Sequence, residues 1–181
     1  MNQSKETLRV LGVDPGFTNL GVAVVEAQKG PSEKVIQTVI FTDCITLGST
    51  EGYRHFPKKL YQSLDSLWEQ YGPFDAVCAE EPTEIQGNPV VSSYLWFVYG
   101  LIRGWLAAKG VLEQQALTPT QLKNRARSLM WDVMSTRPEK TNPSKAEIAE
   151  LLHHLRLPRC RTNHEDDAVL AVIANLGKRQ S

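Results

Sequence analysis

Residues 8–25 read LRVLGVDPGFTNLGVAVV, two apolar runs joined by a short turn. The first run, residues 8–13, ends at Asp14-Pro15-Gly16, a combination typical of turns. The second run, residues 20–25, is rich in the β-branched residues that strands favour, and residues 34–42 alternate as a third strand should. The chain therefore begins with three predicted strands, which we expect to form an antiparallel meander.

The next segments alternate between helical and strand patterns. Phe56, Leu60 and Leu64 have helical spacing within residues 51–71, and Gly72-Pro73 ends that helix. Residues 74–79 form an apolar strand that is followed by two acids. Residues 111–117 are predicted to form a fifth strand, and residues 121–134 a helix. Strands that alternate with helices in this way indicate α/β crossovers after the initial meander.

Three more predicted helices have recognisable ends. Residues 90–109 form a long apolar helix with Gly110 just beyond it. We expect Asn142 to cap helix 145–155, with Pro143 in its first turn, and Asn163 to cap a last helix through residue 176, closed by Gly177. These elements predict a single α/β domain over residues 1–181, with a mixed five-stranded sheet flanked by helices.

The composition is that of an ordinary globular protein, with 181 residues of which 41% are hydrophobic and 22% charged. No stretch approaches the roughly 18 consecutive apolar residues of a transmembrane helix, so we expect no membrane association. The polar N-terminus resembles neither a signal nor a transit peptide. Three distant cysteines, Cys44, Cys78 and Cys160, favour a reducing compartment. We therefore expect a cytoplasmic protein.

The charges are unevenly distributed although the net charge is zero. Residues 1–100 contain 7 Lys or Arg and 12 Asp or Glu, whereas residues 101–181 contain 13 and 8. This asymmetry permits a basic face that could contact a nucleic acid. A chance distribution of solvent-exposed charged residues is the simpler explanation. The charge distribution is therefore compatible with a DNA partner but does not by itself indicate one.

Acidic residues stand where three predicted elements begin or end. Asp14 follows the first strand, Glu80 follows the strand at residues 74–79, and Asp167 lies in the first turn of the last helix. His164 precedes Asp167 by three residues and so shares its helix face. Each acid alone has an ordinary explanation: a turn residue, a solvated strand end, or a charge favoured by the helix dipole.

Taken together, the three acids make sense as a site for a hard cation. Magnesium prefers oxygen ligands and is usually held by a few carboxylates plus substrate phosphates. Two such ions about 4 Å apart can activate a water and stabilise the leaving oxygen in phosphodiester hydrolysis. Without a cation, three clustered carboxylates would repel one another and raise each other's pKa.

The sequence also resembles the RuvC-type Holliday junction resolvases, which are RNase H-like nucleases. Residues 13–24, VDPGFTNLGVAV, are similar to their first motif, residues 77–82, VCAEEP, to their second, and residues 164–168, HEDDA, to their last. Two functional lysines precede the family's last motif. Lys123 in residues 118–123, TPTQLK, matches the first, and Lys145 in residues 142–145, NPSK, matches the second. The resemblance spans nearly the whole chain in the right order.

The resemblance implies an RNase H-like fold and a magnesium-dependent endodeoxyribonuclease. Such an enzyme is a homodimer that binds a four-way DNA junction and hydrolyses two opposed strands symmetrically. The resemblance also implies that Asp14, Glu80 and Asp167 hold two Mg²⁺ ions per site, for which Mn²⁺ would substitute. His164 ligates the second ion or assists the attacking water. Because Glu81 follows Glu80 directly, the alignment with the second motif leaves open which of the two is the metal ligand.

The resemblance also gives roles to basic residues and to the long helix. Lys123 and Lys145 would contact the scissile phosphate or its developing charge. The stretch between them, residues 124–142, is longer than usual and contains Arg125, Arg127 and Trp131. Both arginines are DNA-binding candidates, although a simple surface insertion explains the stretch equally well. The helix from Val90 would supply much of the dimer interface.

Some features depart from the bacterial pattern. Bacterial members carry an aromatic residue shortly after the second-motif Glu, which wedges into the junction, whereas residues 82–89 contain none. A compact, diverged version of this kind suits a bacteriophage as well as a bacterium.

Two other functions stay open at this point. One is an RNase H-like nuclease for flaps, other branched DNA or structured RNA. The other is a non-catalytic junction-binding module, which the intact acid set disfavours.

Overall fold

The computed structural model describes residues 7–16, 18–29, 35–48, 56–83, 88–111, 116–135, 143–155, 157 and 162–176. Within them a four-stranded sheet has the order β3-β2-β1-β4. Its strands are β1 (Thr7–Pro15), β2 (Asn19–Lys29), β3 (Val35–Thr46) and β4 (Ala76–Ala79). β1, β2 and β3 pair antiparallel, which confirms the predicted meander, and β4 runs parallel to β1.

The predicted fifth strand is replaced by a single bridge in the part of the chain that the structure describes. Residues 112–115 lie outside that part, and Leu117 forms one parallel bridge with Glu80. Two backbone hydrogen bonds make this bridge: Leu117 N donates to Ala79 O (3.2 Å), and Glu81 N donates to Leu117 O (2.9 Å). The described sheet therefore has four strands rather than the expected five.

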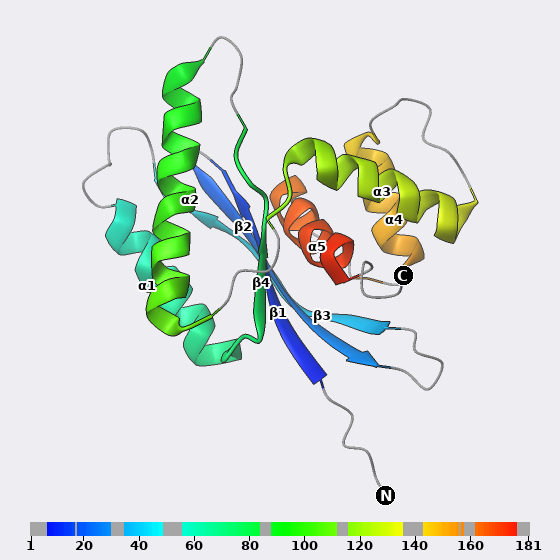
Figure 1. The fold of residues 1–181 in the computed structure, drawn as a ribbon, viewed down its shortest axis with the longest axis horizontal. Coiled ribbons are helices and arrows are strands. Elements are labelled where there is room, and N and C mark those ends of the chain that lie inside the picture. Colours follow the sequence, from blue (N-terminus) through cyan, green and yellow to red (C-terminus); the bar gives the residue numbers. More distant parts are fainter. Residues whose placement is uncertain are drawn as a thin grey trace, which may run out of the picture.

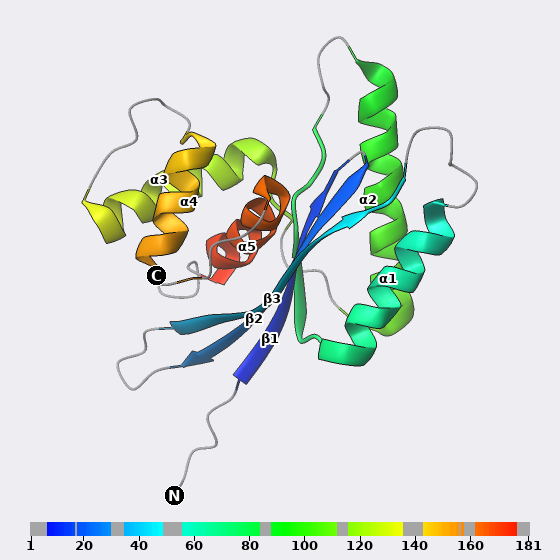
Figure 2. The ribbon, with the colours of Figure 1, turned by 180° about the vertical axis from the view of Figure 1, so that it is seen from behind.

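Helices cover both faces of the sheet (Figures 1 and 2). They are α1 (Phe56–Tyr71), α2 (Pro89–Lys109), α3 (Pro119–Met134), α4 (Lys145–His154) and α5 (Asn163–Leu176). Because successive strand residues point to opposite faces, β1 places Leu11 and Val13 in a core with α1 and α2. Val10 instead joins a second core with α3, α4 and α5. α5 is buried on most of its surface, since it lies between the sheet and the α3–α4 pair.

Two predicted helix caps are wrong by one or two residues. α4 is capped by Ser144, so Pro143 stands before the helix. The Ser144 side chain accepts a hydrogen bond from Glu147 N, and the Glu147 carboxylate accepts one from Ser144 N. Asn142 itself lies outside the described residues, as does Gly177. Asn163 is the first residue of α5, and the hydroxyl of Thr162 accepts from Glu165 N (3.3 Å). Both starts have the Ser/Thr-x-x-Glu spacing of a capping box.

α2 is long and apolar, and one side of it packs on α1. Asp65 of α1 accepts a hydrogen bond from the Trp105 indole (2.9 Å) and pairs with Lys109 (2.9 Å). Gly110 ends the helix in the left-handed conformation, as predicted. By length and composition α2 is the one helix of the described chain that could cross a membrane, and a third of its apolar window is buried inside the protein.

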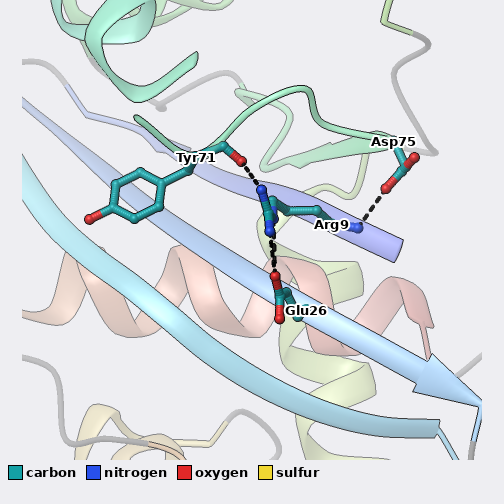
Figure 3. A network of polar contacts seen from close by, with 4 residues as sticks. All are labelled: Arg9, Glu26, Tyr71 and Asp75. Carbon is teal, nitrogen blue, oxygen red and sulfur yellow. Dashed lines mark hydrogen bonds and ion pairs between the residues drawn. The ribbon is translucent and has the colours of Figure 1, made fainter. Parts of the chain in front are cut away.

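A polar network anchors the end of the sheet opposite Asp14 (Figure 3). The Arg9 guanidinium donates to Glu26 of β2 (2.6 Å) and to the carbonyl of Tyr71 at the end of α1 (2.7 Å). Arg9 N also donates to Asp75, just before β4 (2.7 Å). The start of β1 is thereby tied to α1, β2 and β4, which fixes the strands whose other ends carry the acids.

Candidate active site

Asp14 and Glu80 lie side by side because β1 and β4 are adjacent and parallel. Parallel strands end at the same edge of a sheet, and here Val13 of β1 is paired with Ala79 of β4. Glu80 N donates to Val13 O (3.0 Å), which fixes Glu80 beside Asp14. The strand ends thus bring together two of the predicted ligands that are 66 positions apart in the sequence.

The third acid, Asp167, is the fifth residue of α5, just beyond the first turn, and α5 lies directly on β1 and β2. Two glycines allow this approach. A Cβ atom added to Gly12 would lie 2.2 Å from Ala168 O, and one added to Gly21 would lie 2.1 Å from His164 O. Gly21 is also the β2 partner of Asp14. Helix backbone therefore rests on strand backbone, which places the start of α5 next to Asp14.

His164 is hydrogen-bonded to the predicted ligand Asp14. Its Nδ1 lies 2.6 Å from Asp14 Oδ2, and the Asp14 side chain is almost fully buried. This hydrogen bond is the main cause that raises the pKa of His164, and burial opposes it. The contact spans 150 positions of the sequence and joins the first strand to the last helix.

The other two carboxyl groups are strongly perturbed. Burial, followed by the negative charges of Asp14 and Asp167, raises the pKa of Glu80 to about 8. Burial and, next in importance, the charge of Asp14 together raise the pKa of Asp167 to about 6. Carboxylates that share a low-dielectric site oppose each other's ionisation, so these three groups form one electrostatic unit.

Both predicted lysines act on this unit from the helices beside it. The charge of Lys123, the fifth residue of α3, lowers the pKa of Glu80. The charge of Lys145, the first residue of α4, lowers the pKa of Asp167 and of His164. Both lysine side chains are exposed. The structure therefore brings all six predicted catalytic residues to one edge of the sheet.

Similarity to known proteins is found at the level of structure. No protein-family model and no curated protein matches the chain. RuvC from T. thermophilus, in complex with a Holliday junction substrate, matches with a TM-score of 0.72 and 19% identity over 96% of each chain. A second Thermus thermophilus RuvC structure gives 0.71 and 19%, again over 96% of each chain. The chain has the RuvC fold.

A more distant match supports the same architecture. The yeast mitochondrial Holliday junction resolvase Ydc2 gives a TM-score of 0.56 and 16% identity over 92% of this chain and 77% of its own. The RNase H-like architecture predicted from the motifs is thus confirmed. A phage origin stays a prediction.

The RuvC fold places the two candidate arginines of α3 differently. Arg125 is half-buried and donates to Ala174 O near the end of α5 (2.7 Å), and burial lowers its pKa. This contact gives Arg125 a structural role, by satisfying a helix C-terminal carbonyl. Arg127 is exposed. The DNA contacts predicted for both arginines stay predictions.

The donor set suits a hard cation. Asp14, Glu80 and Asp167 supply oxygen ligands, and the burial and repulsion that raise two of their pKa values would be relieved by a divalent ion. In the conformation shown, no three His, Cys, Asp or Glu side chains among the described residues converge closely enough to enclose an ion. Asp14 instead gives one oxygen to His164. Ion binding would therefore require these side chains to move.

Proposed function

We propose that this protein is a structure-specific DNA endonuclease that resolves four-way junctions by symmetric, metal-dependent hydrolysis of two opposed strands. The observation that carries the proposal is the acid cluster of buried Asp14 and half-buried Glu80 and Asp167 at one edge of a RuvC fold, with two lysines beside it. We further expect the enzyme to act in the cytoplasm of a bacterium or of a phage-infected cell.

Asp14, Glu80 and Asp167 would hold two Mg²⁺ ions, for which Mn²⁺ would substitute, and His164 would either ligate the second ion or assist the attacking water. Bound ions would supply an activated water and stabilise the leaving oxygen. The protein's own groups do the rest. Because the Asp14 carboxylate accepts from His164 Nδ1, neutral His164 keeps a lone pair on Nε2 that can take a proton from the attacking water.

Lys123 and Lys145 would bind the DNA backbone at the site. Their charges already act on Glu80 and Asp167 across the site. Ammonium groups so placed can stabilise the charge that develops on the scissile phosphate. Both are exposed, so a DNA strand reaches them without displacing protein.

Symmetric cutting of opposed strands requires two sites, and we propose a homodimer formed through α2. This helix exposes Val90 (67%), Trp96 (42%) and Phe97 (47%). Pro89, Val90, Ser93, Tyr94 and Phe97 line a hollow of about 450 Å³ at its N-terminal half. Large exposed apolar patches mark interfaces.

The substitution Phe97→Glu tests this interface. Light scattering should show that the Phe97→Glu protein is a soluble monomer, and this monomer should no longer make paired nicks. A Phe97→Glu protein that stays dimeric would place the interface elsewhere.

The test of the function is cleavage of end-labelled four-way DNA junctions in Mg²⁺ and in EDTA. Linear duplex, flap, fork and structured RNA substrates serve as controls. Paired, symmetric, metal-dependent nicks confined to the junction would confirm the proposal. Equal cleavage of flaps or of RNA would assign another substrate class to the same site. Tight junction binding without any cleavage would favour a binding module.

A further inference from the structure

The exposed face of α3 carries two cations and one large aromatic residue in a line. Lys123, Arg127 and Trp131 are spaced by four residues and so lie above one another on the helix. All three are exposed, and Trp131 keeps 51% of its surface in solvent. The opposite face of α3 is buried through Leu122, Ala126 and Met130.

This stripe starts at the candidate active site. Lys123 acts electrostatically on Glu80, and α3 runs outward from the strand ends that carry the acids (Figure 1). At 1.5 Å per residue, Trp131 lies about 12 Å farther along the helix than Lys123. At 3.4 Å per nucleotide in a stacked strand, this corresponds to about three or four nucleotides.

The chemistry of the stripe is that of a single-strand binding surface. Proteins that hold unpaired nucleic acid combine cations, which follow the phosphates, with aromatic rings on which bases stack. The exposed positions between the three residues, Asn124 and Ser128, are small and uncharged, so no acid interrupts the stripe. Arg125 points away from it to Ala174 O.

We propose that Lys123, Arg127 and Trp131 form a track for the DNA strand that leaves the cleavage site, and that Trp131 stacks on an unpaired base of that strand. The inference rests on the proposed function and adds a place where the opened centre of a junction is held. A paired base offers no free face to Trp131, so the track selects DNA with unpaired nucleotides.

The first experiment compares Trp131→Ala and Trp131→Phe for binding to four-way junctions and to single-stranded oligonucleotides, by fluorescence anisotropy in EDTA. Loss of one stacked base should weaken binding by about 5- to 150-fold in Trp131→Ala, whereas Trp131→Phe keeps most of the affinity. Val133→Ala is the matched control, because Val133 is exposed (41%) on the same helix but lies off the stripe.

Two further readouts separate stacking from a structural effect. DNA should quench the tryptophan fluorescence of the unaltered protein and of Trp96→Phe, and the quenching should fall sharply in Trp131→Phe. Arg127→Gln should reduce the slope of log affinity against log salt by about one, as the loss of one phosphate contact does.

The outcomes distinguish this inference from the proposed function. If the unaltered protein cleaves junctions but Trp131→Ala binds them as tightly as Val133→Ala does, the track is refuted and the nuclease stands. If Trp131→Ala changes the oligomeric state and leaves DNA affinity unchanged, Trp131 is a protein contact and the track is likewise refuted. If junctions are never cleaved but single strands bind in a Trp131-dependent way, the track holds and the proposed function fails.

Discussion

Replacing Glu80 with Gln should stabilise the metal-free protein while it removes a predicted metal ligand. In the folded protein the pKa of Glu80 is raised to about 8, chiefly by burial, whereas its ordinary value is 4.5. Below pH 4.5 the carboxyl group is protonated in both the folded and the unfolded chain. As the pH rises toward 8, the unfolded chain gains the free energy of ionisation and the folded protein does not, so stability falls.

The size of the effect follows from the two pKa values. Each pH unit between them costs about 1.4 kcal/mol, which sets an upper limit of about 4 kcal/mol at pH 8. Glu80 is only half-buried, and part of its pKa shift depends on the charge of Asp167. We therefore expect Glu80→Gln to raise the free energy of unfolding by roughly 2–4 kcal/mol. For a chain of this length that corresponds to a midpoint raised by about 5–15 °C.

The assay is thermal unfolding in EDTA at pH 5 and pH 8, with Glu81→Gln as the matched control. Glu80→Gln should unfold at a higher temperature than either the unaltered protein or Glu81→Gln at pH 8, and the gap should narrow at pH 5. Adding Mg²⁺ should stabilise the unaltered protein and have little effect on Glu80→Gln. Equal midpoints for Glu80→Gln and Glu81→Gln at pH 8 would refute the reasoning from burial and repulsion.

Three further substitutions test the site. Asp167→Asn should abolish junction cleavage and leave junction binding by gel shift largely intact; retained cleavage would remove Asp167 from the site. Glu81→Gln should keep cleavage within a few-fold, and an inactive Glu81→Gln beside an active Glu80→Gln would move the ligand to Glu81. Gly21→Ala puts a Cβ 2.1 Å from His164 O, so it should lower the free energy of unfolding, measured in urea, by about 1–3 kcal/mol. Because the added Cβ would displace α5, the cleavage rate should also fall about 100-fold. An unchanged rate would contradict the role of close packing.

The sequence predicted the elements and the identity of the acids because both leave local signals. Asp14 and Glu80 each stand at the end of an apolar strand, as the structure confirms, whereas Asp167 is the fifth residue of α5 and so lies just beyond the first turn predicted for it. What local signals do not contain is adjacency: the parallel pairing of β1 with β4 is a contact between distant segments. That adjacency was expected only through the resemblance to a family.

Other details were missed although a signal was present. Gly12 and Gly21 stand inside apolar strands, where glycine often marks a close backbone approach, and they are where α5 rests on the sheet. Arg125 is three residues after the buried Leu122, which places it toward the core rather than among the outward cations. The Ser/Thr-x-x-Glu pattern after Ser144 and Thr162 would have located both helix starts.

The hydrogen bond between His164 and Asp14 joins the two ends of the described chain. During synthesis the first strand, with Asp14, is made about 150 residues before the turn that supplies His164 and Asp167. The acid set is therefore incomplete in every nascent chain until α5 has been translated, and the sheet face that α5 covers stays open until then. A nascent chain that has not yet reached α5 lacks part of the proposed metal site, so the proposed nuclease activity would arise only after α5 has been translated.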